Sequence, residues 1–224
     1  MSVRLYFAYG SNLSLFQMSQ RCPSSTFVGV AHLPNFRWHI NERGYASVTP
    51  SALHSVYGMV YNLTTEDEAS LDVFENVPRS YTKETHLARV CRTSSKEDTG
   101  TLKEGTDVQV LLYIDRLRSA NGAPREEYVG RMERAVKDAI DVGVPTAWID
   151  ENIRPHLPNS PSSGSLAKLA RRFPSLPNSN RCDSSEAFHI QGERPNLTSP
   201  ATQLNLICNL IDDFFQSDVT TSPI

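Results

Sequence analysis

The sequence has 224 residues, of which 39% are hydrophobic and 21% are charged, and its formal net charge is −3 at pH 7. A chain of this length can bury a substantial core in one domain and have residues left for a tail. Nucleic-acid affinity depends on many contacts from Lys and Arg to phosphate. The small negative charge and the lack of a long basic run therefore predict no nucleic-acid partner.

Cysteine spacing and hydropathy indicate which kinds of binding site and which cellular location to expect. The four cysteines form no CxxC pair and have no histidine at ligand spacing, so the sequence predicts neither a metal site nor a disulfide framework. No basic leader precedes an apolar run, and no apolar stretch approaches the roughly 20 residues of a membrane span. We therefore expect a cytoplasmic protein without a membrane partner and with reduced thiols at Cys22, Cys91, Cys182 and Cys208.

Six stretches before residue 115 are rich in β-branched and aromatic residues and predict strands. Turn formers separate them, for example in residues 41–44 and 100–105. Strands of this number can close on themselves. We therefore expect a mixed α+β fold with a small β-barrel or curved sheet and flanking helices. The expected strands are residues 3–9, 36–40, 45–49, 55–63, 85–92 and 108–114.

The first of these strands ends abruptly in the run YFAYGSNL, residues 6–13. Gly10, Ser11 and Asn12 are small residues rich in hydrogen-bond donors, and apolar residues follow them. A strand that ends in such a turn presents backbone N–H groups, which is how proteins bind anions and oxyanions. Gly10 permits the turn in this interpretation, and a positive φ at Gly10 would explain the need for glycine.

A helix is predicted to begin where Thr65 and Glu68 fit a capping box. It must end within residues 75–77, because Pro78 prevents its continuation. Asn76 then occupies the place where a residue in the left-handed conformation usually terminates a helix.

Glu75 therefore lies at a helix C-terminus, with Asp72 and Phe74 close by. The negative end of the helix dipole, a like charge and an apolar neighbour each disfavour an ionised carboxylate. Such a carboxylate is a candidate general base with a raised pKa. The alternative is a solvated glutamate on an amphipathic helix, which is common.

A longer helix is predicted over residues 125–143, with Gly143 and Pro145 as its stop signal. Its apolar stripe should pack on the sheet. Packing in the core is favoured over a role of Tyr128 and Met132 in lining a cofactor pocket. The stripe consists of Tyr128, Met132, Ala135, Val136, Ala139 and Ile140.

The composition changes near Arg154, since eight of the fourteen prolines lie from Pro155 onward among serines and asparagines. We expect a domain of residues 1–154 and a Pro/Ser-rich extension of residues 155–224. Within the extension, a helix over residues 202–216 is expected to dock through one apolar face. That face consists of Leu204, Ile207, Cys208, Ile211, Phe214 and Phe215.

The ordered pair YFAYGSNL and LDVFENVPRSY resembles the γ-glutamylcyclotransferase family, whose hallmarks are a YGSNL-type loop and a glutamate in an LDxxEG-like segment followed by a tyrosine. The resemblance runs from about Tyr6 to Ile140. Related branches usually read YGSLIW or YGTL at the loop, whereas this chain reads YGSNL. It departs from the pattern at Asn76, where glycine is commoner, and in the extension after Arg154.

The resemblance implies a fold built around a small barrel and a site for a small γ-glutamyl molecule, with no cofactor. The implied reaction cyclises the γ-glutamyl group to 5-oxoproline and releases the attached amine, amino acid or peptide, with glutathione conjugates among the substrates to be tested. Glu75 would be the catalytic acid and base. The implied substrate-binding residues are Tyr9, Gly10, Ser11, Asn12, Leu13, Tyr81 and Tyr113.

Three other interpretations remain open at this stage. A non-catalytic γ-glutamyl-binding protein would keep the same site without turnover. Ser11 would be the nucleophile of a hydrolase, although no histidine stands in a triad-like context. A glycosidase would use Asp72 and Glu75, although such enzymes place their two carboxylates on opposite sides of the sugar bond. The sequence leaves the leaving amine and the oligomeric state open.

Overall fold

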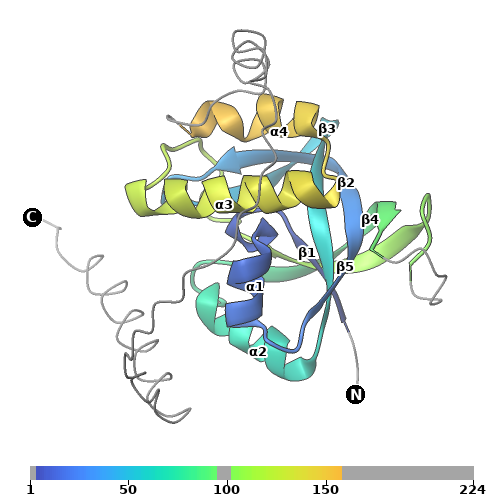
Figure 1. Ribbon diagram of the computed structural model, residues 1–224. Helices are drawn as coiled ribbons and strands as arrows, with labels where there is room; N and C mark the ends of the chain where they lie inside the picture. Colours follow the sequence, from blue (N-terminus) through green and yellow to red (C-terminus); the bar gives the residue numbers. More distant parts are fainter. Residues whose placement is uncertain (1–3, 95–101, 158–224) are drawn as a thin grey trace, which may run out of the picture. The chain divides into compact units, whose positions relative to one another are not determined.

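The computed structural model describes residues 4–94 and 102–157 (Figure 1). All of them belong to the first of two compact units, which comprises residues 1–174. The helix expected over residues 202–216 lies outside the described residues, as does most of the Pro/Ser-rich extension.

Five strands form a closed barrel in the order β1-β3-β2-β4-β5. Neighbouring strands are antiparallel except β1 and β5, which close the barrel as a parallel pair through Tyr6 and Leu111. The expected mixed α+β fold with a small barrel is thus confirmed. The strands are β1 (Arg4–Ala8), β2 (Thr26–Ile40), β3 (Ala46–Leu63), β4 (Thr82–Thr93) and β5 (Asp107–Ile114).

The strand boundaries differ from the expectation in β2 and β3. The segments expected at 45–49 and 55–63 belong to one strand, which continues through Pro50, and β2 begins ten residues before Phe36. Pro50 pairs with Phe36 next to a register shift in β2. Proline is tolerated at such irregularities, because the ladder is already interrupted there.

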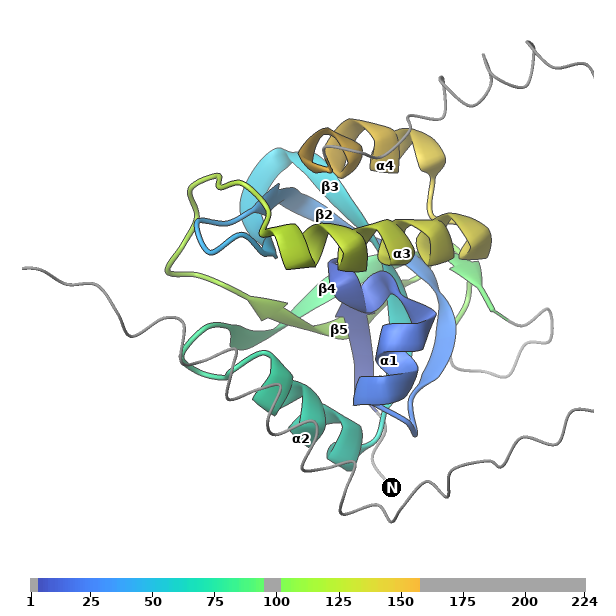
Figure 2. The ribbon, with the colours of Figure 1, turned by 60° about the vertical axis from the view of Figure 1, so that its left-hand side comes forward.

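Four α-helices lie against the barrel, and α1 lies between α3 and α2 (Figures 1 and 2). A short 3-10 turn, η1, precedes α1 and contacts α3. The elements are η1 (Ser11–Leu13), α1 (Leu15–Arg21), α2 (Thr65–Phe74), α3 (Glu126–Val142), α4 (Thr146–Asn152) and η2 (Arg154–His156).

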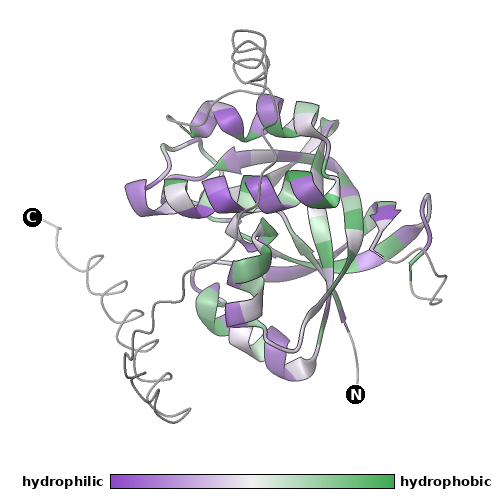
Figure 3. Ribbon diagram, viewed as in Figure 1, coloured by the Kyte–Doolittle hydropathy of each residue, from purple (hydrophilic) through white to green (hydrophobic). Residues whose placement is uncertain are grey.

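The apolar stripe of α3 packs into the core as expected. Five of its six residues are buried, and Ile140 is partly buried against the same cluster. Polar residues dominate the side of α3 that faces the viewer in Figure 3. Gly143 ends the helix with φ +107°, a conformation that glycine adopts without strain.

The ends of α2 fix the position of Glu75. Thr64, not Thr65, is the N-cap, and it exchanges hydrogen bonds with Asp67 in a capping box. The expected capping box of Thr65 and Glu68 was therefore placed one residue too far along the chain. The side chain of Asp67, at the third helical position, accepts the N–H of Thr64 instead. The C-terminus agrees with the expectation, since Glu75 is the C-cap and Asn76 is left-handed with φ +50°.

The described residues show no bonded cysteine pair. Cys22 is buried and Cys91 is exposed, and both are free, whereas Cys182 and Cys208 lie outside the described part. Over residues 4–94 and 102–157, no cluster of three or more His, Cys, Asp or Glu is arranged to hold a metal ion. In the same ranges, no helix has the length and apolar character needed to cross a membrane.

Candidate active site

The turn after β1 is buried between the barrel and α3. Tyr9, Ser11, Asn12 and Leu13 are all buried, and the hydroxyl of Ser14 caps α1. Polar side chains that are held inside a protein must find hydrogen-bond partners. The partners of Ser11 and Asn12 therefore define what this turn can do.

Glycine is needed at position 10 for space and not for a left-handed backbone. Its φ is −115°, so the expected positive φ is wrong. A Cβ placed on Gly10 would lie 3.0 Å from the hydroxyl of Tyr128 and 3.2 Å from the Cβ of Ala46. A side chain at position 10 would therefore fit only if Tyr128 or Ala46 shifted by a few tenths of an ångström.

We predict that Gly10→Val destabilises the protein by about 1–3 kcal/mol, because the added methyl groups overpack the contact with Tyr128. It should also impair any activity of the turn. Urea unfolding and turnover measure the two effects. The matched control is Gly130→Val, since a Cβ at Gly130 meets nothing within 4 Å. Equal stability of the Gly10 variant and the control would contradict the close-packing explanation.

Ser11 is held by two donors. Its Oγ accepts hydrogen bonds from Gln17 Nε2 at 2.9 Å and from Arg131 Nη2 at 2.8 Å. A hydroxyl oxygen has two lone pairs and one proton to donate. With both lone pairs engaged, Ser11 can act toward a ligand only as a donor.

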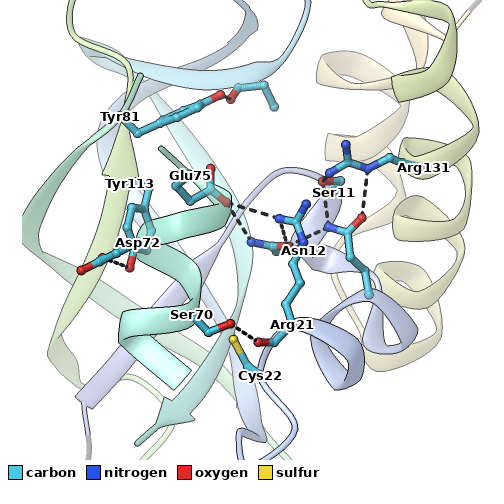
Figure 4. A network of polar contacts seen from close by, with 12 residues as sticks. Ser11, Asn12, Arg21, Cys22, Ser70, Asp72, Glu75, Tyr81, Tyr113 and Arg131 are labelled. Atoms are coloured by element: carbon cyan, nitrogen blue, oxygen red, sulfur yellow. Dashed lines mark hydrogen bonds and ion pairs between the residues drawn. The ribbon is translucent and has the colours of Figure 1, made fainter. Parts of the chain in front are cut away.

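Asn12 connects the turn to Glu75. Its amide nitrogen donates to the Tyr6 hydroxyl at 2.9 Å and to Glu75 Oε1 at 3.3 Å. Its amide oxygen accepts from Gln17 Nε2 at 2.7 Å and from Arg21 Nη1 at 3.2 Å. The four hydrogen bonds fix the orientation of the amide, and with it the position of the Glu75 carboxylate; Figure 4 shows the contacts of Asn12 with Glu75 and Arg21.

The carboxylate of Glu75 is largely enclosed. Its side chain is 16% exposed, and Oε1 lies 3.6 Å from Nη1 of Arg21, whose guanidinium stacks over the ring of Phe74. Burial raises the pKa of Glu75, while Arg21, Arg131 and the hydrogen bond from Asn12 act in the opposite direction. The raised pKa agrees with the sequence-based expectation, but its main cause is burial.

The Asp72 carboxylate has different hydrogen-bond partners from the Glu75 carboxylate. Its carboxylate accepts from Lys83 Nζ at 2.7 Å and from the Tyr113 hydroxyl at 2.8 Å. In Figure 4, Asp72 and Tyr113 lie apart from the group formed by Glu75, Asn12 and Arg21. Asp72 is therefore engaged elsewhere and is not placed as the second carboxylate of a glycosidase.

The three tyrosines expected at the site are buried, and their hydroxyls have partners. Tyr81 donates to the carbonyl of Ala46 at 3.0 Å, and Tyr9 donates to the carbonyl of Tyr113. Burial raises the pKa of each tyrosine, so all three are neutral. The charge of Glu75 raises the pKa of Tyr9, Tyr81 and Tyr113, although the Tyr113 hydroxyl itself is directed to Asp72.

Tyr128 also accepts hydrogen bonds through its hydroxyl, which its position in the apolar stripe did not predict. Its ring is buried as expected, but its hydroxyl accepts from the backbone N–H of Ser11 at 3.2 Å and of Ala46 at 3.3 Å. Both lone pairs are thus used, and its proton remains to be donated. The hydroxyl on an otherwise apolar stripe was the one signal in the sequence, since a buried tyrosine hydroxyl usually has a hydrogen-bond partner.

The backbone donors of the turn are fewer than expected. The N–H of Ser11 donates to Tyr128 and that of Leu13 donates to the carbonyl of Gly10. Within the described ranges, the N–H groups of Gly10 and Asn12 make no hydrogen bond to another backbone group. The N–H groups of the turn that are already engaged are therefore those of Ser11 and Leu13.

Three residues outside the two motifs, Gln17, Arg21 and Arg131, surround the turn with amide groups and positive charge. Gln17 and Arg21 lie four residues apart on α1 and so share one face, which was the one signal available. Arg131 is brought to Ser11 by the packing of α3, across 120 residues of sequence. Such a long-range contact leaves no local pattern.

Comparison with known proteins connects this geometry to a family. A family model described as "Gamma-glutamyl cyclotransferase, AIG2-like" matches residues 6–129. A γ-glutamylcyclotransferase of Bos taurus is 27% identical over 169 residues, which are 62% of this chain and 88% of that protein. A γ-glutamylcyclotransferase of Mus musculus is 37% identical over 83 residues, 33% of this chain and 44% of that protein.

Solved structures agree on the fold. One described as "Gamma-glutamyl cyclotransferase" has a TM-score of 0.58 at 21% identity and covers 77% of this chain and 100% of its own. An uncharacterised protein from Homo sapiens has a TM-score of 0.58 at 22% identity and covers 76% of this chain and 99% of its own. The matched residues 6–129 are more than half of the chain and include the turn, Glu75 and Tyr81, and the chain therefore belongs to the γ-glutamyl cyclotransferase, AIG2-like family.

Proposed function

We propose that this protein is an active γ-glutamylcyclotransferase in which Glu75 is the general acid and base. The observation that carries the proposal is the contact between Asn12 and Glu75, which joins the YGSN turn to an enclosed carboxylate with a raised pKa. A carboxylate with a pKa nearer neutrality both accepts and donates protons efficiently at physiological pH.

The proposed reaction is intramolecular. The α-amine of the γ-glutamyl group attacks its own γ-carbonyl carbon and forms the C–N bond of 5-oxoproline, and the bond to the leaving nitrogen then breaks. Glu75 takes one proton from the α-ammonium before the attack and a second from the same nitrogen as the ring forms. It passes each in turn to the leaving nitrogen, which departs as an ammonium, so no proton is gained or lost overall. Holding the chain folded supplies a large part of the rate, because no second reactant must be captured.

The donors around the turn suit the negative charge that develops on the γ-carbonyl oxygen. Ser11 and Tyr128 each have a hydroxyl proton left to donate. Because these donors are held in place before substrate arrives, they stabilise an oxyanion without reorganising. The same arrangement disfavours Ser11 as a nucleophile, since both groups that contact its hydroxyl are donors and neither can take its proton.

A panel of γ-glutamyl compounds tests the proposal. The purified full chain is incubated with γ-glutamyl amino acids, γ-glutamyl amines, glutathione and bulky glutathione S-conjugates, and 5-oxoproline is measured by mass spectrometry. Release of 5-oxoproline from any of them supports the proposal. Binding of these compounds without product would favour the alternative, a non-catalytic γ-glutamyl-binding protein with the same network.

The pH dependence should reflect the raised pKa of Glu75. A base with a raised pKa becomes protonated at a higher pH, so kcat should decline on acidification above the ordinary glutamate range of about 4.3. Arg21 opposes the upward shift, and Arg21→Gln should therefore move the decline to still higher pH. A plot of kcat against pH measures both. A wild-type decline at the ordinary glutamate pKa, or a shift to lower pH in the variant, would contradict the assignment.

A further inference from the structure

Arg43 lies in the tight turn that joins β2 to β3, next to the YGSN turn. The Asn41 side-chain oxygen accepts from the N–H groups of Arg43 at 3.0 Å and Tyr45 at 3.1 Å. Arg125 donates to the Arg43 carbonyl at 2.9 Å, and Gly44 has a φ of +86° that few other residues adopt. The backbone of Arg43 is therefore fixed before any ligand binds.

One nitrogen of the Arg43 guanidinium lacks a hydrogen-bond partner. Its Nη1 is buried and has no hydrogen-bond acceptor, and no carboxylate of the described residues pairs with it. The other two arginines near Glu75 use part of their five N–H donors within the protein, Arg21 toward Asn12 and Arg131 toward Gln17 and Ser11, and both keep further N–H groups. A buried donor without a partner costs free energy, more so when it is charged. A structure that retains such a donor is prepared for an anion that binds it.

Contacts through Tyr45 and Tyr128 connect Arg43 to the YGSN turn. Its guanidinium lies 5.6 Å from the ring centroid of Tyr45, which packs edge-on against Tyr128. The Tyr128 hydroxyl in turn meets Gly10 and Ser11 of the turn. Burial raises the pKa of Glu75 and of Tyr81, and the charge of Arg43 acts in the opposite direction on both groups, as expected for a nearby cation.

We propose that Arg43 is a specificity-determining residue that binds a carboxylate on the leaving part of the substrate. This inference rests on the proposed function. The α-carboxylate of the γ-glutamyl group is bonded to the carbon that bears the reacting amine, so it lies on the Glu75 side, where α1 and α3 supply Arg21 and Arg131. Arg43 lies in the β2–β3 turn instead, and we assign it to the carboxylate of the leaving amino acid, beyond the γ-carbonyl. The favoured substrates are then γ-glutamyl amino acids or peptides with a free carboxylate, and not γ-glutamyl amines.

The experiment compares two substrates that differ only in that carboxylate, γ-glutamyl-alanine and γ-glutamyl-alaninamide. The full chain should turn over the acid with a kcat/KM at least about tenfold higher than that for the amide, as expected for a charge-assisted hydrogen bond. Arg43→Gln should bring this ratio close to one, mainly through KM for the acid. Arg43→Lys should restore part of the ratio, because it keeps the charge but loses the planar fork.

The control is Arg134→Gln, which removes the same charge from an exposed position of α3 and should leave the ratio as in the wild type. A wild-type ratio near one, or equal losses on both substrates in Arg43→Gln, would overturn the inference while cyclotransferase activity stands. Release of 5-oxoproline from neither substrate would instead count against the proposed function. Calorimetric binding of the acid and the amide then tests Arg43 independently, and equal affinities would overturn its role.

Discussion

Glu75→Gln is expected to lower turnover of γ-glutamyl substrates by about 10²-fold or more, because it removes the proton-transferring group and preserves its shape. The amide of glutamine can still accept from Asn12, whose donated hydrogen bond orients the side chain. The loss should therefore appear in kcat, with little change in KM. Steady-state release of 5-oxoproline measures both quantities.

The stability of this variant should remain close to that of the wild type. Because the folded-state pKa of Glu75 is raised, its ionised form destabilises the protein above that pKa, and the neutral glutamine removes this cost. Arg21 loses an ionic partner at 3.6 Å but keeps Asn12 and the ring of Phe74. The two effects act in opposite directions, so thermal unfolding at neutral pH should show no large shift.

The matched control for Glu75→Gln is Glu68→Gln, which makes the same chemical change on the same helix. The Glu68 carboxylate pairs with Arg4 and Lys83 outside the network of Asn12. A partly exposed ion pair contributes little to stability, and this variant should keep wild-type turnover. Near-normal turnover of the Glu75 variant, or an equal loss in both variants, would remove Glu75 from the chemistry.

The parts of the fold with local signals were predictable from the sequence. The β-rich segments, the stripe of α3 and the stop at Asn76 and Pro78 each depend on neighbouring residues, and the structure confirms them. The division of β3 into two strands was wrong, because Pro50 and the residues after it resemble a turn. Only the pairing with β2, a tertiary interaction, holds that segment in the barrel.

The parts of the candidate site that lie in a sequence motif were predictable, whereas the parts assembled by packing of distant residues were not. The YGSN turn and Glu75 occur as an ordered pair of motifs, and the structure joins them through Asn12. Arg131 and the Tyr128 hydroxyl reach the same turn because α3 packs on it, which a local pattern cannot reveal. The need for glycine at position 10 was likewise not predictable from local sequence, because it comes from the close approach of Tyr128 and Ala46 and not from a positive φ.

Acetylation of the α-nitrogen should make a γ-glutamyl substrate inert in the proposed reaction, because that nitrogen is the nucleophile. An acetylated nitrogen is part of an amide and has no basic lone pair with which to attack the γ-carbonyl. Several hydrolytic schemes, in contrast, would release the same amine from a γ-glutamyl amide without using this nitrogen. The comparison of free and N-acetylated substrate by release of the leaving amine thus separates cyclisation from hydrolysis.

Reaction in ¹⁸O-labelled water gives the second arm of this test. Water takes no part in the bond-breaking step of cyclisation, so 5-oxoproline should carry no label and no free glutamate should form. The enclosed position of Glu75 among Asn12 and Arg21, rather than in open solvent, suits a reaction from which water is excluded. Labelled glutamate as the main product, or turnover of the acetylated substrate, would instead indicate a hydrolase. An activated water or Ser11 would then be the nucleophile, and the donors that surround the Ser11 hydroxyl would have to rearrange during catalysis.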